Sequence, residues 1–371
     1  MLLKNIFVFA LISSFLLFLG SSNSSLAQEF YDNHPTDHDT TYYISYNEQL
    51  HLRLYTVYKF NELIVNADEQ GNENLTYTPN GNLNVGFGFN YKGLGINIGL
   101  NLPAINNDND KFGETQKLDM RSYVYGRKYA FDLGLQFYKG FYISELNRDN
   151  PPNNTEPIEL RGDMKIHTVG VSVLKIHNHE KFSFRAAFAQ TEVQKKTAGS
   201  LIYGPYINFV RIKADSSLIP EYIRNEYLLS SNIVEGWYGS MGITAGYAQS
   251  LILFKRFFIT AAAALGYGAT FGHSYYETQK GKVNETAWKG GIKINSKVAL
   301  GYNSEKTYVG GSFVLESYNI TTSEKNMSLY WMGQYRFNIV RRFNWKVAPL
   351  DWVFDKKDRI LKSGPYKKEK N

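Results

Sequence analysis

The chain has 371 residues, no cysteine and a formal net charge of +7. The lack of cysteine excludes disulfides and thiolate metal sites, and the charge, much of it between Asp355 and Asn371, does not indicate a nucleic-acid partner. The 28 Tyr and 24 Phe accompany a negative mean hydropathy, as expected where one face of each strand meets lipid and the other a polar interior.

The N-terminus has the pattern of a secretion signal. Lys4 precedes an apolar run from Ile6 to Leu19, and Ser25-Leu26-Ala27 has the small residues of a cleavage site. The run falls short of the roughly 18 apolar residues that a membrane helix needs. The predicted organisation is a signal peptide at 1–27, a periplasmic leader at 28–49, one barrel domain at 50–339 and a basic periplasmic tail at 340–371.

The clearest strand pattern lies between Leu83 and Leu102. Apolar side chains alternate with Asn or Gly up to Tyr91, and the alternation resumes after Lys92-Gly93. A period of two places alternate side chains on opposite faces, and a Lys-Gly pair supplies the positive φ of a tight turn. The sequence therefore predicts a β-hairpin with one apolar face.

Thirteen runs are candidate strands, beginning near Leu50, Leu75, Leu94, Thr115, Tyr129, Asp163, Lys181, Gly199, Gly236, Phe257, Lys289, Thr307 and Met327. Bacterial barrels normally have an even strand number, with short periplasmic turns and longer outer loops. That alternation requires zero or two strands between Thr191 and Gly236. We expect zero, with Glu192–Glu235 as an outer loop or an inward-folded plug, because Asp215–Glu235 is polar and irregular and contains Pro220.

The predicted fold class is all-β, an antiparallel transmembrane β-barrel of about 12 strands, with 14 as the alternative. Without a second apolar helix, strands must cross the membrane, because only helices and closed barrels satisfy every backbone polar group in lipid. A soluble β-sandwich would fit the same strands. Sandwiches, however, seldom keep Phe, Tyr and Leu on one face over so many strands of about ten residues.

The last candidate strand places Trp331, Gly333, Tyr335 and Phe337 on one face. This pattern resembles the C-terminal recognition strand of outer-membrane barrels, and it predicts the barrel-assembly machinery as a partner. Because the chain continues beyond Phe337 to Asn371, the signal would be internal. A hydrophobic edge strand is the alternative interpretation.

Several segments together resemble a known set: Leu75-Thr76-Tyr77-Thr78-Pro79-Asn80, Tyr91-Lys92-Gly93, Lys181-Phe182-Ser183-Phe184, Gln194-Lys195-Lys196-Thr197-Ala198-Gly199-Ser200 and Gly301-Tyr302-Asn303. They resemble the uncharacterised domain-of-unknown-function family four-four-two-one, whose members are exported, outer-membrane-barrel-like proteins of Gram-negative bacteria. The resemblance spans about residues 40 to 340. It implies an exported barrel and carries no assigned activity.

Charged residues on the faces opposite the apolar stripe are candidates for lining a lumen: Lys117, Asp119, Arg121, Arg185, Lys293, Lys297 and Arg336. On a lipid face each charge would cost roughly 2–4 kcal/mol at the midplane, so an interior position is expected. A basic constriction would favour anionic solutes. Alternatively, these side chains interlock into a network that fills a narrow barrel.

We predict no cofactor, no metal site and no enzymatic activity, because no nucleophile elbow, phosphate loop or zinc-helix motif occurs. Neighbouring His273 and Ser274 would point to opposite faces of a strand, which makes a hydrolase the least favoured alternative. The expected role is a passive small pore or a structural membrane protein. The alternative is a surface-binding or assembly component acting through its long outer loops. Expected partners are outer-membrane lipid and either a small solute or a surface protein.

Overall fold

The computed structural model describes residues 38–66, 74–92, 94–101, 106, 108–147, 158–226, 229–278, 281–324 and 326–347. Its strands are β1 (Tyr43–Ser45), β2 (Leu50–Asn66), β3 (Asn74–Thr78), β4 (Leu83–Tyr91), β5 (Leu94–Asn101), β6 (Gln116–Tyr125), β7 (Tyr129–Asn147), β8 (Leu160–Ile176), β9 (Glu192–Gln194), β10 (Ala198–Lys213), β11 (Ile233–Leu253), β12 (Phe257–Thr278), β13 (Gly281–Asn303), β14 (Thr307–Thr321) and β15 (Met327–Phe343). Short helices α3 (Asn109–Phe112), η2 (Arg185–Ala189), η3 (Glu221–Glu226) and η4 (Leu229–Ser231) lie in the connections. The predicted signal peptide lies outside the described residues.

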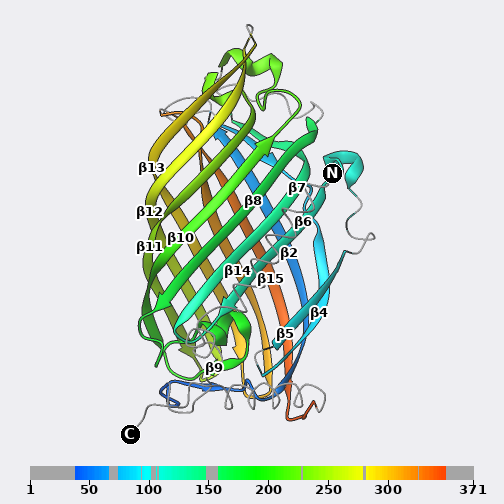
Figure 1. The fold of residues 1–371 in the computed structure, drawn as a ribbon. Helices are drawn as coiled ribbons and strands as arrows, with labels where there is room; N and C mark the ends of the chain where they lie inside the picture. The colour runs from blue at the N-terminus through cyan, green and yellow to red at the C-terminus, as the bar shows by residue number, and fades with distance from the viewer. Residues whose placement is uncertain are drawn as a thin grey trace, which may run out of the picture.

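Ten tilted strands form a closed antiparallel ring (Figure 1). Their order around the ring is β2, β3, β7, β8, β10, β11, β12, β13, β14 and β15, and β15 pairs with β2 to close it. Three further strands are not part of the closed ring. β4 pairs with β2 and carries β5, and β6 pairs with β7. The predicted all-β antiparallel barrel is confirmed, whereas the predicted count of 12 strands is not.

The two ends of the barrel differ in the length of their connections. Short turns at 126–128, 254–256 and 304–306 lie at one end, which we call the turn end. The opposite end, which we call the loop end, carries the connection 214–232 between β10 and β11.

The wall is built differently at these two ends. β3 and β4 pair with successive parts of β2, since Leu63 faces Tyr77 and Tyr58 faces Leu83. At the loop end β3 also pairs with β7 and completes the ring. Toward the turn end β4 pairs with β5 and β6 pairs with β7, but β5 and β6 do not pair with each other. We call the boundary between β5 and β6 the seam; β4 and β5 lie on the side of the barrel away from β11, β12 and β13 (Figure 1).

The strand predicted near Lys181 is wrong. Residues 177–197 instead form a compact segment at the turn end, which contains η2 and β9 and which we call the plug. Phe182 and Phe184 are two residues apart, as in a strand with one apolar face. Both side chains are buried in the apolar cluster of the plug instead. The described end of the predicted leader joins it, because β1 pairs with β9.

The prediction that Glu192–Glu235 contributes no strand to the barrel is also wrong. This segment contains β10, which pairs over its whole length with β11 and over much of it with β8. Only residues 214–232 form an outer connection. The alternation of short and long connections misled the strand count for two reasons. The chain forms the plug between β8 and β10, and β3 and β4 both pair with the same strand, β2.

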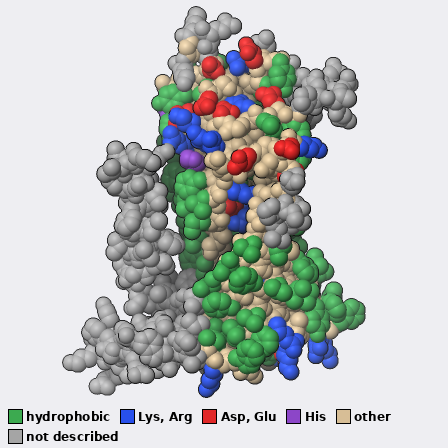
Figure 2. Space-filling model, turned by 90° about the vertical axis from the view of Figure 1, so that its right-hand side faces the viewer, with side chains coloured by type: hydrophobic (Ala, Val, Ile, Leu, Met, Phe, Trp, Pro, Cys, Tyr) green, Lys and Arg blue, Asp and Glu red, His purple; other side chains and the backbone are tan. Residues whose placement is uncertain are grey.

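The predicted hairpin around Lys92 is confirmed as β4 and β5, and Lys92 adopts a φ of 50°. Its apolar face points outward, with Phe87 53% exposed and Leu100 53% exposed. Figure 2 shows a band of hydrophobic side chains over the turn-end part of this side, with Lys and Arg along the rim. β15 continues to Phe343, beyond the predicted domain boundary at residue 339.

Candidate functional site: the filled barrel interior

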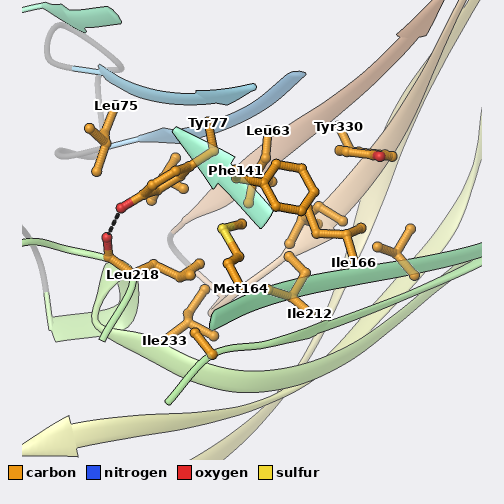
Figure 3. Close-up of a cluster of buried hydrophobic side chains, with 14 of the residues drawn as sticks. Leu63, Leu75, Tyr77, Phe141, Met164, Ile166, Ile212, Leu218, Ile233 and Tyr330 are labelled. Atoms are coloured by element: carbon orange, nitrogen blue, oxygen red, sulfur yellow. Dashed lines mark hydrogen bonds between the residues drawn. The ribbon is translucent and has the colours of Figure 1, made fainter. Parts of the chain in front are cut away.

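An apolar core closes the interior at the loop end (Figure 3). Inward-facing side chains of the strands, such as Leu63, Ile166 and Ile212, meet Leu218 from the connection 214–232, and all four are fully buried. The Tyr77 hydroxyl donates a hydrogen bond to the carbonyl oxygen of Leu218. We call this cluster the loop-end core. It forms because inner-face residues near this end are apolar, while their outward neighbours such as Arg211 and Lys213 are charged and exposed.

An arginine on β8 holds the start of the same connection. Arg161 donates to the carbonyl of Ser217 at 2.8 Å and pairs with Asp163 at 2.9 Å, while Asp163 accepts from the backbone N–H of Asp215. Both residues lie beyond the exposed Lys213–Glu235 pair, on the loop side of the apolar band. Hydrogen bonds from Arg161 lower the pKa of the Asp163 carboxyl to about 2. The pair therefore stays ionised at neutral pH.

Midway along the interior, Asp119 is the acceptor for several strands. It pairs with Lys59 at 3.0 Å and with Arg121 at 2.7 Å, and it accepts hydrogen bonds from Gln136 and Tyr138. These donors come from β2, β6 and β7. The single carboxylate thus connects the two sides of the wall that the seam separates.

A second group of charges spans the barrel from β7 to β13 and β14. Asp132 pairs with Lys297 and accepts from Asn295 at 3.0 Å, while Lys293 pairs with Glu316 at 3.2 Å. All of these side chains are buried. Aromatic rings cover the two lysines: Tyr123 and Tyr125 contact Lys297, and Tyr206 and Tyr318 contact Lys293. Together with the Asp119 cluster we call this the ionic layer.

The plug is fixed at the turn end by one buried carboxylate. Glu192 lies 3.5 Å from Arg127 and 3.4 Å from Arg185, and Ser183 donates to it. Arg342 of β15 donates to the carbonyl of Gln190 at 2.6 Å. The plug is therefore held against the barrel wall by the ion pair with Arg127 and by the charge-assisted hydrogen bond from Arg342, which is of the stronger kind.

The structure brings most of the predicted lumen residues into these contacts. Asp119, Arg121, Lys293 and Lys297 belong to the ionic layer, and Arg185 belongs to the plug. The remaining two residues differ from these. Lys117 is exposed and donates to Asn82 at 2.5 Å, whereas Arg336 lies over the ring of Tyr55 at 4.3 Å.

The sequence analysis missed the partners of these residues: Lys59, Arg127, Asp132, Glu192 and Glu316. Asp132 and Glu316 occupy inner-face positions of alternating strands and could have been found by that signal. Glu192 could not, because it begins the segment predicted as an outer loop or an inward-folded plug, and no local pattern shows that it would meet Arg127 and Arg185.

The predicted assembly strand is β15. Tyr335 and Phe337 are exposed on its outer face, where Tyr335 stacks on Phe313 at 4.7 Å between ring centroids. A hollow of about 350 Å³ on the outer surface is lined by these rings and by side chains of β2 and β13, including Tyr58 and Leu300. It lies within the apolar band.

His273 and Ser274 do not form a catalytic pair. The Ser274 hydroxyl is buried against Tyr238 at 3.0 Å, whereas His273 Nδ1 contacts Thr286 Oγ1 at 2.6 Å. Tyr238 itself is buried in the loop-end core. Among the described residues there is no group of three or more His, Cys, Asp or Glu side chains suited to hold a metal ion.

A family model described as a domain of unknown function (DUF4421) matches residues 37–343. No curated protein matches the chain. Solved structures are similar only at a distance. The outer membrane protease OmpT from Escherichia coli has 9% identity and a TM-score of 0.35, with 81% of this chain and 98% of that one covered. The translocator domain of the autotransporter NalP from Neisseria meningitidis has 11% identity and a TM-score of 0.31, with 90% and 97% covered.

Proposed function

The chain belongs to the DUF4421 family of unknown function, as its sequence motifs predicted, and we propose that it is a structural outer-membrane barrel that does not conduct solutes through its lumen. The observation that carries this proposal is the filled interior. The loop-end core, the ionic layer and the plug follow one another along the barrel axis. A passive pore would need a continuous polar path between them.

The outer surface supports the membrane location. Large apolar side chains are exposed on β2, β4, β5, β10, β11, β12, β13 and β15. Exposed apolar surface on that scale would be costly in water, whereas it is the normal lipid-facing band of a transmembrane barrel. Short turns and the described chain ends would then face the periplasm, and the connection 214–232 would face outward.

Single-channel recording in planar bilayers tests the proposal. Folded wild-type protein, checked by heat-modifiable mobility on gels and by flotation with liposomes, is expected to give no conductance steps. A variant with residues 181–196 replaced by a Gly-Ser linker is expected to stay silent, because the ionic layer and the loop-end core remain. Reproducible steps from the wild type would contradict the proposal and favour the pore.

A second candidate, binding of a surface partner, rests on the outer connection. Tyr222 is 62% exposed and Leu229 54% exposed, although Ile219 and Ile223 beside them are fully buried. Apolar side chains kept at the outermost surface suit a protein contact. Replacing Tyr222 and Leu229 with Ser should abolish capture of a partner from the cell envelope while leaving the barrel heat-modifiable. Unchanged capture would rule this surface out.

A further inference from the structure

Three arginines in the turn-end half of the interior, Arg53, Arg336 and Arg342, have no acidic partner within the described residues. Arg342 donates instead to the carbonyls of Ser304 and Gln190 and to Asn303 Oδ1, whereas Arg53 and Arg336 are less well satisfied. Lys59, Arg121, Arg127, Arg185, Lys293 and Lys297 each form an ion pair with a carboxylate. Arg53 instead donates to Asn97 Oδ1 and to the carbonyl of Ala189, both at 2.9 Å. Arg336 lies over the ring of Tyr55. The Nε atoms of Arg53 and Arg336 are buried and lack a hydrogen-bond partner.

Asn338 lies between Arg53 and Arg336 on the same inner face. In the pairing of β15 with β2, Asn338 faces Tyr55, Arg336 faces Val57 and Arg53 faces Val340. Asn338 is 1% exposed, and neither its amide nitrogen nor its amide oxygen has a partner. An unsatisfied buried amide costs about 1–3 kcal/mol, so in a native structure such a group usually binds a water, an ion or a ligand.

The seam provides a route to this cluster. Arg53 and Arg336 are partly exposed although they face inward, and Asn97 on β5 is exposed although it faces the interior. The ring of Tyr55 lies so close to Gly86 that a Cβ at that position would collide with it. Glycine at position 86 thus leaves room for the Tyr55 ring, which the Arg336 guanidinium contacts.

We propose that Arg53, Arg336 and Asn338 bind the oxyanion of a phosphate or carboxylate group that enters from the membrane through the seam. Two guanidinium forks match the geometry of such oxyanions, and an anion between them would supply the missing counter-charge. The Asn338 amide nitrogen would donate a further hydrogen bond. This site does not depend on the proposed function, since a barrel with a conducting or a closed lumen could equally contain it.

Calorimetric titration of the folded full chain in non-ionic detergent tests the site, with dodecyl phosphate and inorganic phosphate as separate probes. We expect saturable binding of dodecyl phosphate, at least tenfold weaker in Arg336→Gln and in Arg53→Gln. Arg341→Gln is the matched control, because Arg341 is exposed on the same strand and its guanidinium donates to Thr307 Oγ1. Its affinity should stay within twofold of the wild type.

The two probes distinguish a lipid headgroup from a free oxyanion. Tighter binding of dodecyl phosphate than of inorganic phosphate would support the site and assign it to an amphiphile in the membrane. Equal binding lost in the same variants would support the site and assign it to a free oxyanion. Absence of saturable binding by either probe, or equal affinity in the wild type and in both arginine variants, would overturn the proposal.

Asn338→Asp provides an independent test that does not depend on a weakened fold. A carboxylate placed between the arginines should act as a built-in anion. It should raise the midpoint of thermal unfolding and weaken dodecyl phosphate binding at least tenfold, whereas Asn338→Leu should not raise the midpoint. A lower midpoint for Asn338→Asp than for Asn338→Leu would contradict the claim that Arg53 and Arg336 lack a counter-charge.

Discussion

The loop-end and turn-end halves of this barrel differ in how the wall is paired and in what fills the interior. At the loop end β3 joins β2 to β7, and the interior is packed with apolar side chains. At the turn end β5 and β6 leave a seam, and the interior is filled by ion pairs and by the plug. Packing density holds the first half, whereas a few buried charges that bridge strands hold the second. The second half should therefore respond more sharply to the loss of a single group.

The largest expected effect is at the centre of the ionic layer. Asp132→Ala leaves the buried Lys297 without its carboxylate, and breaking a buried pair in this way costs about 3–5 kcal/mol. Chemical unfolding in detergent, followed by tyrosine and tryptophan fluorescence, measures the loss. The double variant Asp132→Leu/Lys297→Met is the control and should lose much less. Equal losses would mean that packing, rather than charge, holds this half.

A smaller effect is expected in the loop-end core. Leu218→Ala removes a fully buried side chain from the connection 214–232 and should cost about 2–3 kcal/mol. Limited proteolysis should then cut this connection faster, while the barrel resists. Leu229→Ala, at an exposed position of the same connection, should change neither result. If Leu218→Ala left the cutting rate unchanged, the core would not be what holds the connection.

The smallest effect concerns the anchor at Arg161. Because the folded pKa of Asp163 is lowered to about 2, the pair stabilises the fold above the ordinary pKa near 3.8, and this contribution is lost as the pH falls through about 2. The Asp163 side chain is 22% exposed, so solvent screens the pair in part and the effect should be about 1 kcal/mol. Unfolding midpoints of the wild type and of Asp163→Asn should converge as the pH falls from 5 to 2. A difference in midpoint that stays constant over this pH range would contradict a stabilising role for the Arg161–Asp163 pair.

The sequence predicted the barrel and its polar interior because alternation is a local signal. The hairpin at Lys92 and the inward positions of Lys293 and Lys297 follow directly from it. The plug could not be predicted, because Phe182 and Phe184 alternate with polar residues as a strand does. Nor could the seam, since which strand follows β2 in the wall depends on long-range pairing.

Which charged residues pair with each other also could not be predicted from local sequence patterns. Lys297 and Asp132 are 165 residues apart in the chain, and only the closed ring brings them together. At the loop end Ile166 and Ile212 point inward while Arg211 and Lys213 point outward. This is the reverse of the polar-inside pattern used for the other strands, so alternation alone would assign these faces wrongly.

Hydrogen exchange of the protein in lipid nanodiscs tests the difference between the two halves most directly. The central claim is that the wall is sealed by β3 at the loop end and unpaired between β5 and β6 at the turn end. Amides of residues 94–101 are predicted to exchange within minutes, while those of residues 257–278, hydrogen-bonded on both sides, stay protected for hours. Protection of residues 94–101 equal to that of 257–278 would contradict the claim.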